Sequence, residues 1–332
     1  MIKNGGFPYS IFCTLYQACV CSIADYSSEV FGYESFESVT KIHLRAARSF
    51  LGVPKTTPLS GIISEINLLL PQSRAQIRMI RQYHRVLKMD NSRLTKRIYS
   101  WDKKLNDENI VKTWNSEINA IFSQNNLDEM FQSGLIFDIK DTVTKIQNSM
   151  LLSQQSSVKV QCENMPKLRT FVKFKDFFST PSYLTKPLSF IQRKFLAKTR
   201  LGCLEIRIET GRYSRPRLPE ASRICLACPE PTNQVENEYH FIFECEAYRD
   251  ERLIWIDKLT IPNNFSTLQH SQKLKIVLND HNNVKLSAQY LINIYDKRSK
   301  IVTIKTSNDD QNNVLYHLLP HDQCPACTYL VD

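Results

Sequence analysis

The sequence predicts a mainly α-helical chain, in which a helical domain precedes a basic helical neck and a small module built around cysteine and histidine. Two observations favour this fold class. Apolar residues recur at helical spacing through the first half of the chain, and Cys and His side chains gather at short intervals in the second half. With 332 residues, of which 42% are hydrophobic, the chain is long enough for two domains with separate cores.

Residues 36–51 illustrate the helical pattern. Their apolar side chains fall on one side of a helix at about 100° per residue, and these are Phe36, Val39, Ile42, Ala46 and Phe50. Gly52 and Pro54 then end the helix. Similar spacing predicts helices at residues 73–89, 91–105, 110–122, 139–152, 188–201, 271–278 and 284–298. The alternation of apolar residues over 204–208 predicts a short strand.

The segment from Asn4 to Ala24 contains no charged residue. A membrane-spanning helix needs about 20 predominantly apolar residues, and the hydroxyl and amide side chains in this segment weaken that interpretation. We therefore expect a helix buried through Ile11, Leu15, Ala18 and Val20, with a secretion signal as the alternative.

Changes in composition suggest four regions. The polar run at 153–157 is typical of a connection between domains. We therefore predict a helical domain over residues 1–152, a linker over 153–165, a basic neck with the Cys and His module over 166–260, and a helical extension with a tail over 261–332.

Positive charge is concentrated in two blocks of the chain. The total is +10, yet residues 71–104 carry ten basic side chains against two acidic ones, and residues 166–224 carry fourteen against four. Concentrated positive charge beside neutral or acidic stretches indicates a polyanionic partner, most often RNA or DNA. The alternative is a solvated, lysine-rich surface.

Four arginines form a ladder on the predicted helix at 73–89. They are Arg74, Arg78, Arg81 and Arg85, which share a narrow arc of that helix. Like charges at this spacing repel one another, and phosphates lying along the helix would relieve that repulsion. An exposed face with unrelated acidic neighbours is the alternative.

The strongest chemical signal is a C-x2-C-x11-H-x4-C array formed by Cys225, Cys228, His240 and Cys245. This spacing is typical of a closed, tetrahedral structural zinc site, and thiolate and imidazole ligands favour zinc over hard cations. His240 and Cys245 would lie about 140° apart on a regular helix, so the chain must bend between them. Reduced cysteines packed in a small core are the alternative.

Other residues extend or limit this interpretation. Glu236 and Glu238 precede His240 and could accept hydrogen bonds from the ligands or cap a helix. A second metal site near the end of the chain would use His317, His321, Cys324 and Cys327, although these ligands are crowded and an accidental tail composition is the alternative. The ten cysteines do not form a disulfide framework, and two CxxC pairs in a long basic chain are more often metal sites than bridges. This usage favours a reducing, intracellular compartment, nuclear or cytoplasmic.

Several enzyme classes lack their sequence signatures here. The eight glycines form neither a GxGxxG nor a GxxxxGK[ST] loop, and no GxSxG or HExxH motif is present. We therefore expect no small-molecule substrate.

The segments "AKTRLGCLEIRIETGRYSR", "RICLAC" and "ENEYHFIFECEAYRDER" resemble the zinc-binding region at the C-terminal end of reverse transcriptases from LINE-type non-LTR retrotransposons. All four ligand positions of that zinc knuckle are filled here. Residues 45–105 resemble the helical thumb and linker of these enzymes, and residues 166–178 resemble the part between linker and knuckle. The resemblance covers about residues 9–300.

The resemblance implies a thumb-like region that grips template RNA or target DNA. In a nucleic-acid-binding module of this kind, we expect Arg200 and Arg212 to contact phosphates together with the four arginines of the ladder. A polymerase of this family also needs a palm with paired catalytic aspartates, and the only adjacent pair, Asp309 and Asp310, follows the knuckle in a polar context. We therefore expect a non-catalytic binding fragment. The alternative is an inert or protein-interaction remnant without a nucleic-acid role.

Overall fold

The computed structural model describes residues 7–32, 34, 37–107, 113–229 and 233–310, and it is mainly α-helical, as predicted. Within these ranges the only β pairing is an isolated antiparallel bridge between Ile224 and Val235. The chain divides into two compact units. The first unit comprises Met1–Glu205 and Leu259–Ala288, and the second comprises Ile206–Lys258 and Gln289–Asp332.

The described part of the first unit contains thirteen α-helices. They are α1 (Tyr9–Leu15), α2 (Ser22–Ala24), α3 (Ser28–Phe31), α4 (Glu37–Leu51), α5 (Leu59–Ile66), α6 (Pro71–Leu87), α7 (Leu94–Asp107), α8 (Trp114–Gln124), α9 (Asp128–Ser133), α10 (Ile139–Glu163), α11 (Ser182–Thr185), α12 (Phe190–Arg200) and α15 (His270–Asn279). Most of the predicted helices therefore exist. Their boundaries are shifted by a few residues, except that the helices predicted at 139–152 and 284–298 continue to Glu163 and Asp310.

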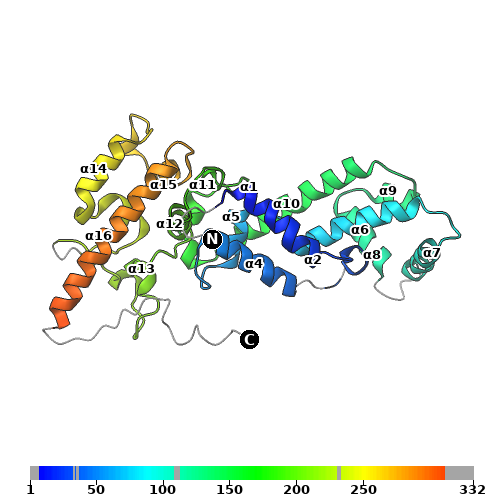
Figure 1. The fold of residues 1–332 in the computed structure, drawn as a ribbon, viewed down its shortest axis with the longest axis horizontal. Helices are drawn as coiled ribbons and strands as arrows, with labels where there is room; N and C mark the ends of the chain where they lie inside the picture. Colours follow the sequence, from blue (N-terminus) through cyan, green and yellow to red (C-terminus); the bar gives the residue numbers. More distant parts are fainter. Residues whose placement is uncertain (1–6, 33, 35–36, 108–112, 230–232, 311–332) are drawn as a thin grey trace. The chain divides into compact units, whose positions relative to one another are not determined.

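A core of apolar side chains holds α6, α8, α9 and α10 together, and α6 and α10 lie side by side (Figure 1). Tyr83 of α6 lies at its centre, with its ring 5.8 Å from Phe122 and 5.5 Å from Phe131. Thr113 starts α8 with a capping box, and Asp138 accepts two backbone N–H groups at the start of α10. Apolar burial stabilises this part of the first unit.

The uncharged N-terminal segment is helical, but its buried face differs from the predicted one. Ile11 and Leu15 are each 46% exposed, whereas Phe12 and Tyr16 are buried. Phe12 stacks on Phe50 at 4.3 Å, and a π-helical turn over Tyr16–Cys21 changes the helical phase beyond α1. The aromatic side chains thus determine which face turns inward.

The predicted linker does not separate two units, because α10 continues through the polar run to Glu163. The amides in that run have structural roles. Gln154 accepts the backbone N–H of Leu70 and donates to the carbonyl of Leu68, while Gln155 donates to Asn67 at 2.7 Å. Polar side chains that bind a neighbouring loop produce the same composition as a linker.

Helix α7 presents its apolar stripe to solvent. Leu94, Ile98 and Trp101 are 69%, 54% and 63% exposed. The opposite face makes the internal contacts, with Lys96 donating to the carbonyls at the end of α6 and Asp102 accepting the backbone N–H of residue 115. The apolar pattern correctly predicted the helix and not its orientation.

The second unit contains α13 (Arg207–Thr210), α14 (Arg249–Asp257) and most of α16 (Val284–Asp310), joined by irregular chain. The strand predicted at 204–208 is absent from the described structure, because α13 begins at Arg207. Trp255 stacks on Tyr290 at 4.0 Å, and the Tyr290 hydroxyl donates to the Ile242 carbonyl at 2.8 Å. No helix in the described ranges has both the length and the apolar character to cross a membrane.

Candidate metal centre

Cys225 and Cys228 lie on a turn that follows the isolated β-bridge. The Cys225 N–H donates to the Gln234 carbonyl, and the Glu236 N–H donates to the Arg223 carbonyl, each at 2.9 Å. These two bonds bring the chain at 234–236 beside the first cysteine. The bridge therefore positions the CxxC turn and Glu236 next to each other.

His240 and Cys245 are brought together by a π-helical turn over His240–Glu244. The Cys245 N–H donates to the His240 carbonyl at 2.9 Å, which is an i→i+5 hydrogen bond. A turn of this width places residues five apart on nearly the same side. The bend predicted between these two ligands is thus confirmed, and its form is a π turn.

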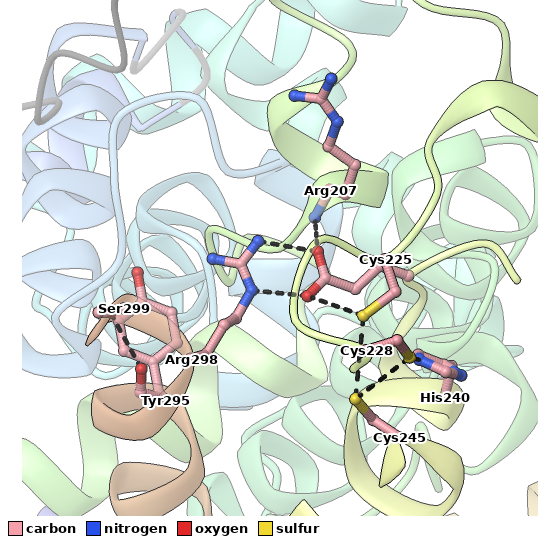
Figure 2. A network of polar contacts seen from close by, with 9 residues as sticks. Arg207, Cys225, Cys228, His240, Cys245, Tyr295, Arg298 and Ser299 are labelled. Atoms are coloured by element: carbon pink, nitrogen blue, oxygen red, sulfur yellow. Dashed lines mark hydrogen bonds and ion pairs between the residues drawn. The ribbon is translucent and has the colours of Figure 1, made fainter. Parts of the chain in front are cut away.

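The four predicted ligands converge, and all are buried (Figure 2). Their donor atoms lie within 4.8 Å of one another. The sulfur of Cys245 is 3.8 Å from that of Cys225 and 3.7 Å from that of Cys228, and the Cys228 sulfur is 3.5 Å from His240 Nε2. This cluster could hold a metal ion.

Glu236 connects the cluster to the rest of the second unit. Its carboxylate accepts the Cys225 thiol at 3.8 Å and the Arg207 backbone N–H at 2.6 Å. Arg298 of α16 binds the same carboxylate through Nε at 2.6 Å and Nη2 at 2.8 Å (Figure 2). Glu236 is fully buried and Arg298 is 7% exposed, so this ion pair is sheltered from water.

Further contacts fix the backbone around the ligands. Lys305 of α16 donates to the Cys228 carbonyl at 2.7 Å, and Arg252 of α14 donates to the Cys245 carbonyl at 2.8 Å. His240 Nδ1 lies 3.7 Å from a carboxylate oxygen of Glu244. At this distance Nδ1 makes no hydrogen bond, while Nε2 lies on the cysteine side, where it could bind a metal.

A hydrogen bond with Cys245, together with burial, raises the pKa of the Cys225 thiol. The negative charge of Glu236 acts in the same direction. Without a cation the thiol therefore stays protonated, and a metal must displace this proton when it binds.

The predicted arginine ladder lies on α6, but its four members differ in their surroundings. Arg74 is bound by Asp25 through two hydrogen bonds of 2.9 Å, and Asp25 itself is buried. Arg78 is half-buried, and Arg81 and Arg85 are exposed. In the described ranges no acidic side chain pairs with these three, and Arg85 donates only to Gln82. The outward part of the ladder is therefore Arg78, Arg81 and Arg85.

The prediction that Arg200 contacts phosphate is wrong. Its side chain is fully buried and binds both carboxylate oxygens of Glu65, at 2.8 and 3.0 Å. Its Nη1 donates to the Leu278 carbonyl at 2.8 Å, and its guanidinium lies over the Phe174 and Tyr183 rings. Arg200 therefore stabilises the core of the first unit.

Arg212 is also less accessible than predicted. Its side chain is 15% exposed, and Nε lies 3.3 Å from a carboxylate oxygen of Glu209. The proposed second set of ligands, His317, His321, Cys324 and Cys327, lies outside the described residues.

Sequence reasoning missed Arg298 and Glu244. Glu244 lies between two ligands, so its proximity to His240 could have been found from the spacing. Arg298 is 62 residues from Glu236 and resembles any other basic residue at the end of a predicted helix. Glu238 is buried like Glu236.

No family model, curated protein or solved structure matches the chain.

Proposed function

We propose that the chain is a non-catalytic nucleic-acid-binding module, with a structural zinc centre in its second unit and a phosphate-binding arginine face on α6 in its first. One observation carries the proposal: the chain contains both a buried Cys3His cluster and, within residues 71–104, arginines that have no acidic partner among the described residues. The net charge of residues 71–104 is +8. RNA or DNA would be bound chiefly through phosphates, with weak sequence preference.

The geometry of the cluster supports zinc as the metal. Zn–S bonds of about 2.3 Å at tetrahedral angles place two sulfurs about 3.8 Å apart, and a Zn–N bond of about 2.0 Å places sulfur and nitrogen about 3.5 Å apart. Three of the six donor separations are 3.8, 3.7 and 3.5 Å, and all six lie within 4.8 Å. Three cysteines and one histidine leave no open position, which is typical of structural rather than catalytic zinc.

The arginine face, formed by Arg78, Arg81 and Arg85, supports phosphate binding because no acidic side chain in the described ranges pairs with it. Arg74 is held by Asp25 and is not part of the proposed surface. Arg78, Arg81 and Arg85 keep their guanidinium charges close together, and each bound phosphate would reduce their mutual repulsion. The resemblance to the C-terminal region of LINE-type reverse transcriptases agrees with both parts of the proposal and stays a prediction.

Fluorescence anisotropy of labelled RNA and DNA across a salt series tests the phosphate part. We expect the triple variant R78Q/R81Q/R85Q to bind more weakly and to flatten the plot of log affinity against log salt. Each lost phosphate contact removes about 0.7 from the slope on single strands and about 0.9 on duplex DNA.

The matched control is K140Q/K145Q/K159Q, which removes the same charge from the exposed face of α10. Lys145 and Lys159 already pair with acidic neighbours on that helix, at 2.8 and 4.0 Å. The control should therefore change binding little. Equal losses in the two variants would mean that net charge alone, and not the α6 face, drives binding.

A protein-interaction role is the second candidate, and the exposed stripe of Leu94, Ile98 and Trp101 on α7 favours it. Leu94 and Ile98 neither stack on bases nor bind phosphate, and Trp101 is the one member of the stripe that can stack on a base. An exposed stripe that is mostly aliphatic suits a protein partner better than a nucleic acid. Absence of RNA and DNA binding at low salt by the folded, zinc-loaded chain would favour this role.

A further inference from the structure

Glu236 places a buried negative charge beside the sulfur ligands. A Cys3His site holding a divalent cation carries three thiolates and therefore a net charge of −1. The Glu236 carboxylate lies 3.8 Å from the Cys225 sulfur and has no exposed surface. An uncompensated carboxylate in this position would repel the thiolates and oppose metal binding.

Arg298 supplies the compensating charge from a distant part of the chain. Its guanidinium binds both carboxylate oxygens, at 2.6 and 2.8 Å. The same carboxylate also accepts the Arg207 N–H, and the Glu236 carbonyl accepts the N–H of Ile208 at 3.0 Å. Glu236 therefore needs its charge balanced without losing its acceptor oxygens, which a bidentate arginine achieves.

We infer that Arg298 is a positioning residue for the metal centre: by holding and neutralising Glu236, it keeps Cys225 in ligating position and raises the affinity of the cluster for zinc. This inference rests on the proposed zinc centre and extends it to α16. Lys305, two turns further along α16, adds a contact to the Cys228 carbonyl, so this helix touches the backbone or partners of both CxxC cysteines. Metal binding should therefore stabilise the packing of α16 in the second unit, and this packing should in turn strengthen metal binding.

The test compares the zinc affinity of the full chain with that of R298M by competition against a chromophoric chelator. Loss of a group that orients a ligand through its neighbour typically weakens metal binding about 10- to 100-fold, and we expect a loss in this range. Titration with Co2+ should give the same tetrahedral thiolate spectrum in both proteins, with saturation of the variant at higher metal concentration.

The matched control is K297M, one residue earlier on the same helix. Lys297 binds the carboxylate of Glu251 at 2.7 Å, but both side chains are about one-third exposed and neither touches the cluster. Since K297M removes the same charge, it should leave zinc affinity essentially unchanged. A loss in K297M equal to that in R298M would contradict a specific role for Arg298.

The double variant E236Q/R298M shows whether R298M loses zinc affinity through the uncompensated charge of Glu236 or through a general disturbance of the fold. Gln keeps an oxygen acceptor for the Arg207 N–H while the charge beside Cys225 disappears, so the double variant should bind zinc more tightly than R298M. The inference is overturned if R298M and the wild type bind zinc equally, or if the double variant is as weak as R298M. If the wild-type chain binds no zinc, the proposed metal centre fails as well.

Discussion

Each of the two units contains a buried arginine–glutamate pair among its described residues, and the surroundings of these two pairs differ. In the first unit, Arg200 and Glu65 have no exposed side-chain surface and lie among aromatic rings and helix backbone. In the second unit, Arg298 and Glu236 lie against the Cys3His cluster. The buried ion pair of the first unit therefore lies within a core, and that of the second unit lies beside a set of candidate metal ligands.

This difference indicates how each unit is stabilised. The first unit packs long helices around many fully buried apolar side chains, such as those of α6, α8 and α10. The second unit surrounds its ligands with irregular chain and the short helices α13 and α14, and α16 is its one long described helix. Small folds with little regular structure commonly depend on a metal or on disulfides, and the described cysteines are all free. We therefore expect the two units to respond differently to loss of metal.

Removal of zinc should have the largest effect and should be confined to the second unit. Apparent binding free energies of structural zinc are about 10–16 kcal/mol in small zinc-dependent folds, so little of the ordered structure should survive without the ion. Hydrogen exchange of the full chain, with and without a strong chelator, should show lost protection over residues 206–258 and retained protection in α6 and α10. The Cys245→Ser variant should behave like the chelated protein.

The exposed Cys19 provides the matched control, because Cys19→Ser makes the same chemical change far from the ligands in sequence and within the first unit. This variant should bind one equivalent of zinc and keep its exchange pattern. Equal protection of residues 206–258 with and without chelator would show that the second unit is stable without metal, and the contrast between the units would disappear.

Breaking the buried pair of the first unit should have the next largest effect. Arg200→Met leaves the carboxylate of Glu65 buried without its partner, and removal of one member of such a pair costs about 3–5 kcal/mol of unfolding free energy. Urea denaturation followed by circular dichroism would measure this loss. Zinc content should not change, since the substitution lies in the first unit.

Replacing both Glu65 and Arg200 by apolar residues shows whether the stability lost in Arg200→Met comes from the unpaired buried carboxylate or from disrupted packing. The double variant E65L/R200L removes both charges, so it should be more stable than Arg200→Met. An Arg200→Met protein with unchanged stability and weakened RNA binding would instead restore the phosphate role that burial argues against.

Local patterns predicted much of this molecule because helices and ligand turns depend on residues close in sequence. The predicted helix at 73–89 corresponds to α6 at Pro71–Leu87, and the four ligands are close in space as their spacing indicated. The role of each arginine depends on partners distant in sequence. Arg200 and Arg81 both lie on basic helices, yet Arg200 meets a carboxylate 135 residues away and Arg81 faces solvent.

The same reason explains why the domain boundary and the α7 face were missed. A polar run can be a linker or the outer surface of a long helix, and only the bonds of Gln154 and Gln155 to the loop at 67–70 distinguish the two. An amphipathic stripe predicts a helix without identifying what covers its apolar face. Both outcomes are decided by tertiary contacts, which a local pattern does not contain.

Acid should weaken the first unit through one histidine, with a smaller effect than the two changes above. His43 is buried on α4, its Nδ1 lies 2.8 Å from the Tyr16 hydroxyl, and Arg74 and Asp25 act on it electrostatically. Burial, assisted by the positive charge of Arg74, lowers the pKa of His43 from 6.5 to about 4. Below pH 6.5, His43 becomes protonated in the unfolded chain but stays neutral in the folded chain. The free energy of unfolding therefore decreases as the pH falls towards 4.

The loss at pH 5 should be about 2 kcal/mol relative to pH 7, because the unfolded state gains about 1.4 kcal/mol for each pH unit below its own pKa. Other groups also titrate in this range, so the informative quantity is the difference between wild type and His43→Gln, measured by urea denaturation at both pH values. The Gln side chain can keep a hydrogen bond to Tyr16 and cannot take up the proton, so the variant should lose less stability on acidification. An equal loss in the two proteins would mean that His43 has the same pKa in the folded and unfolded chains. The acid sensitivity of the molecule would then arise elsewhere, for example from protonation of the Cys3His ligands in the second unit.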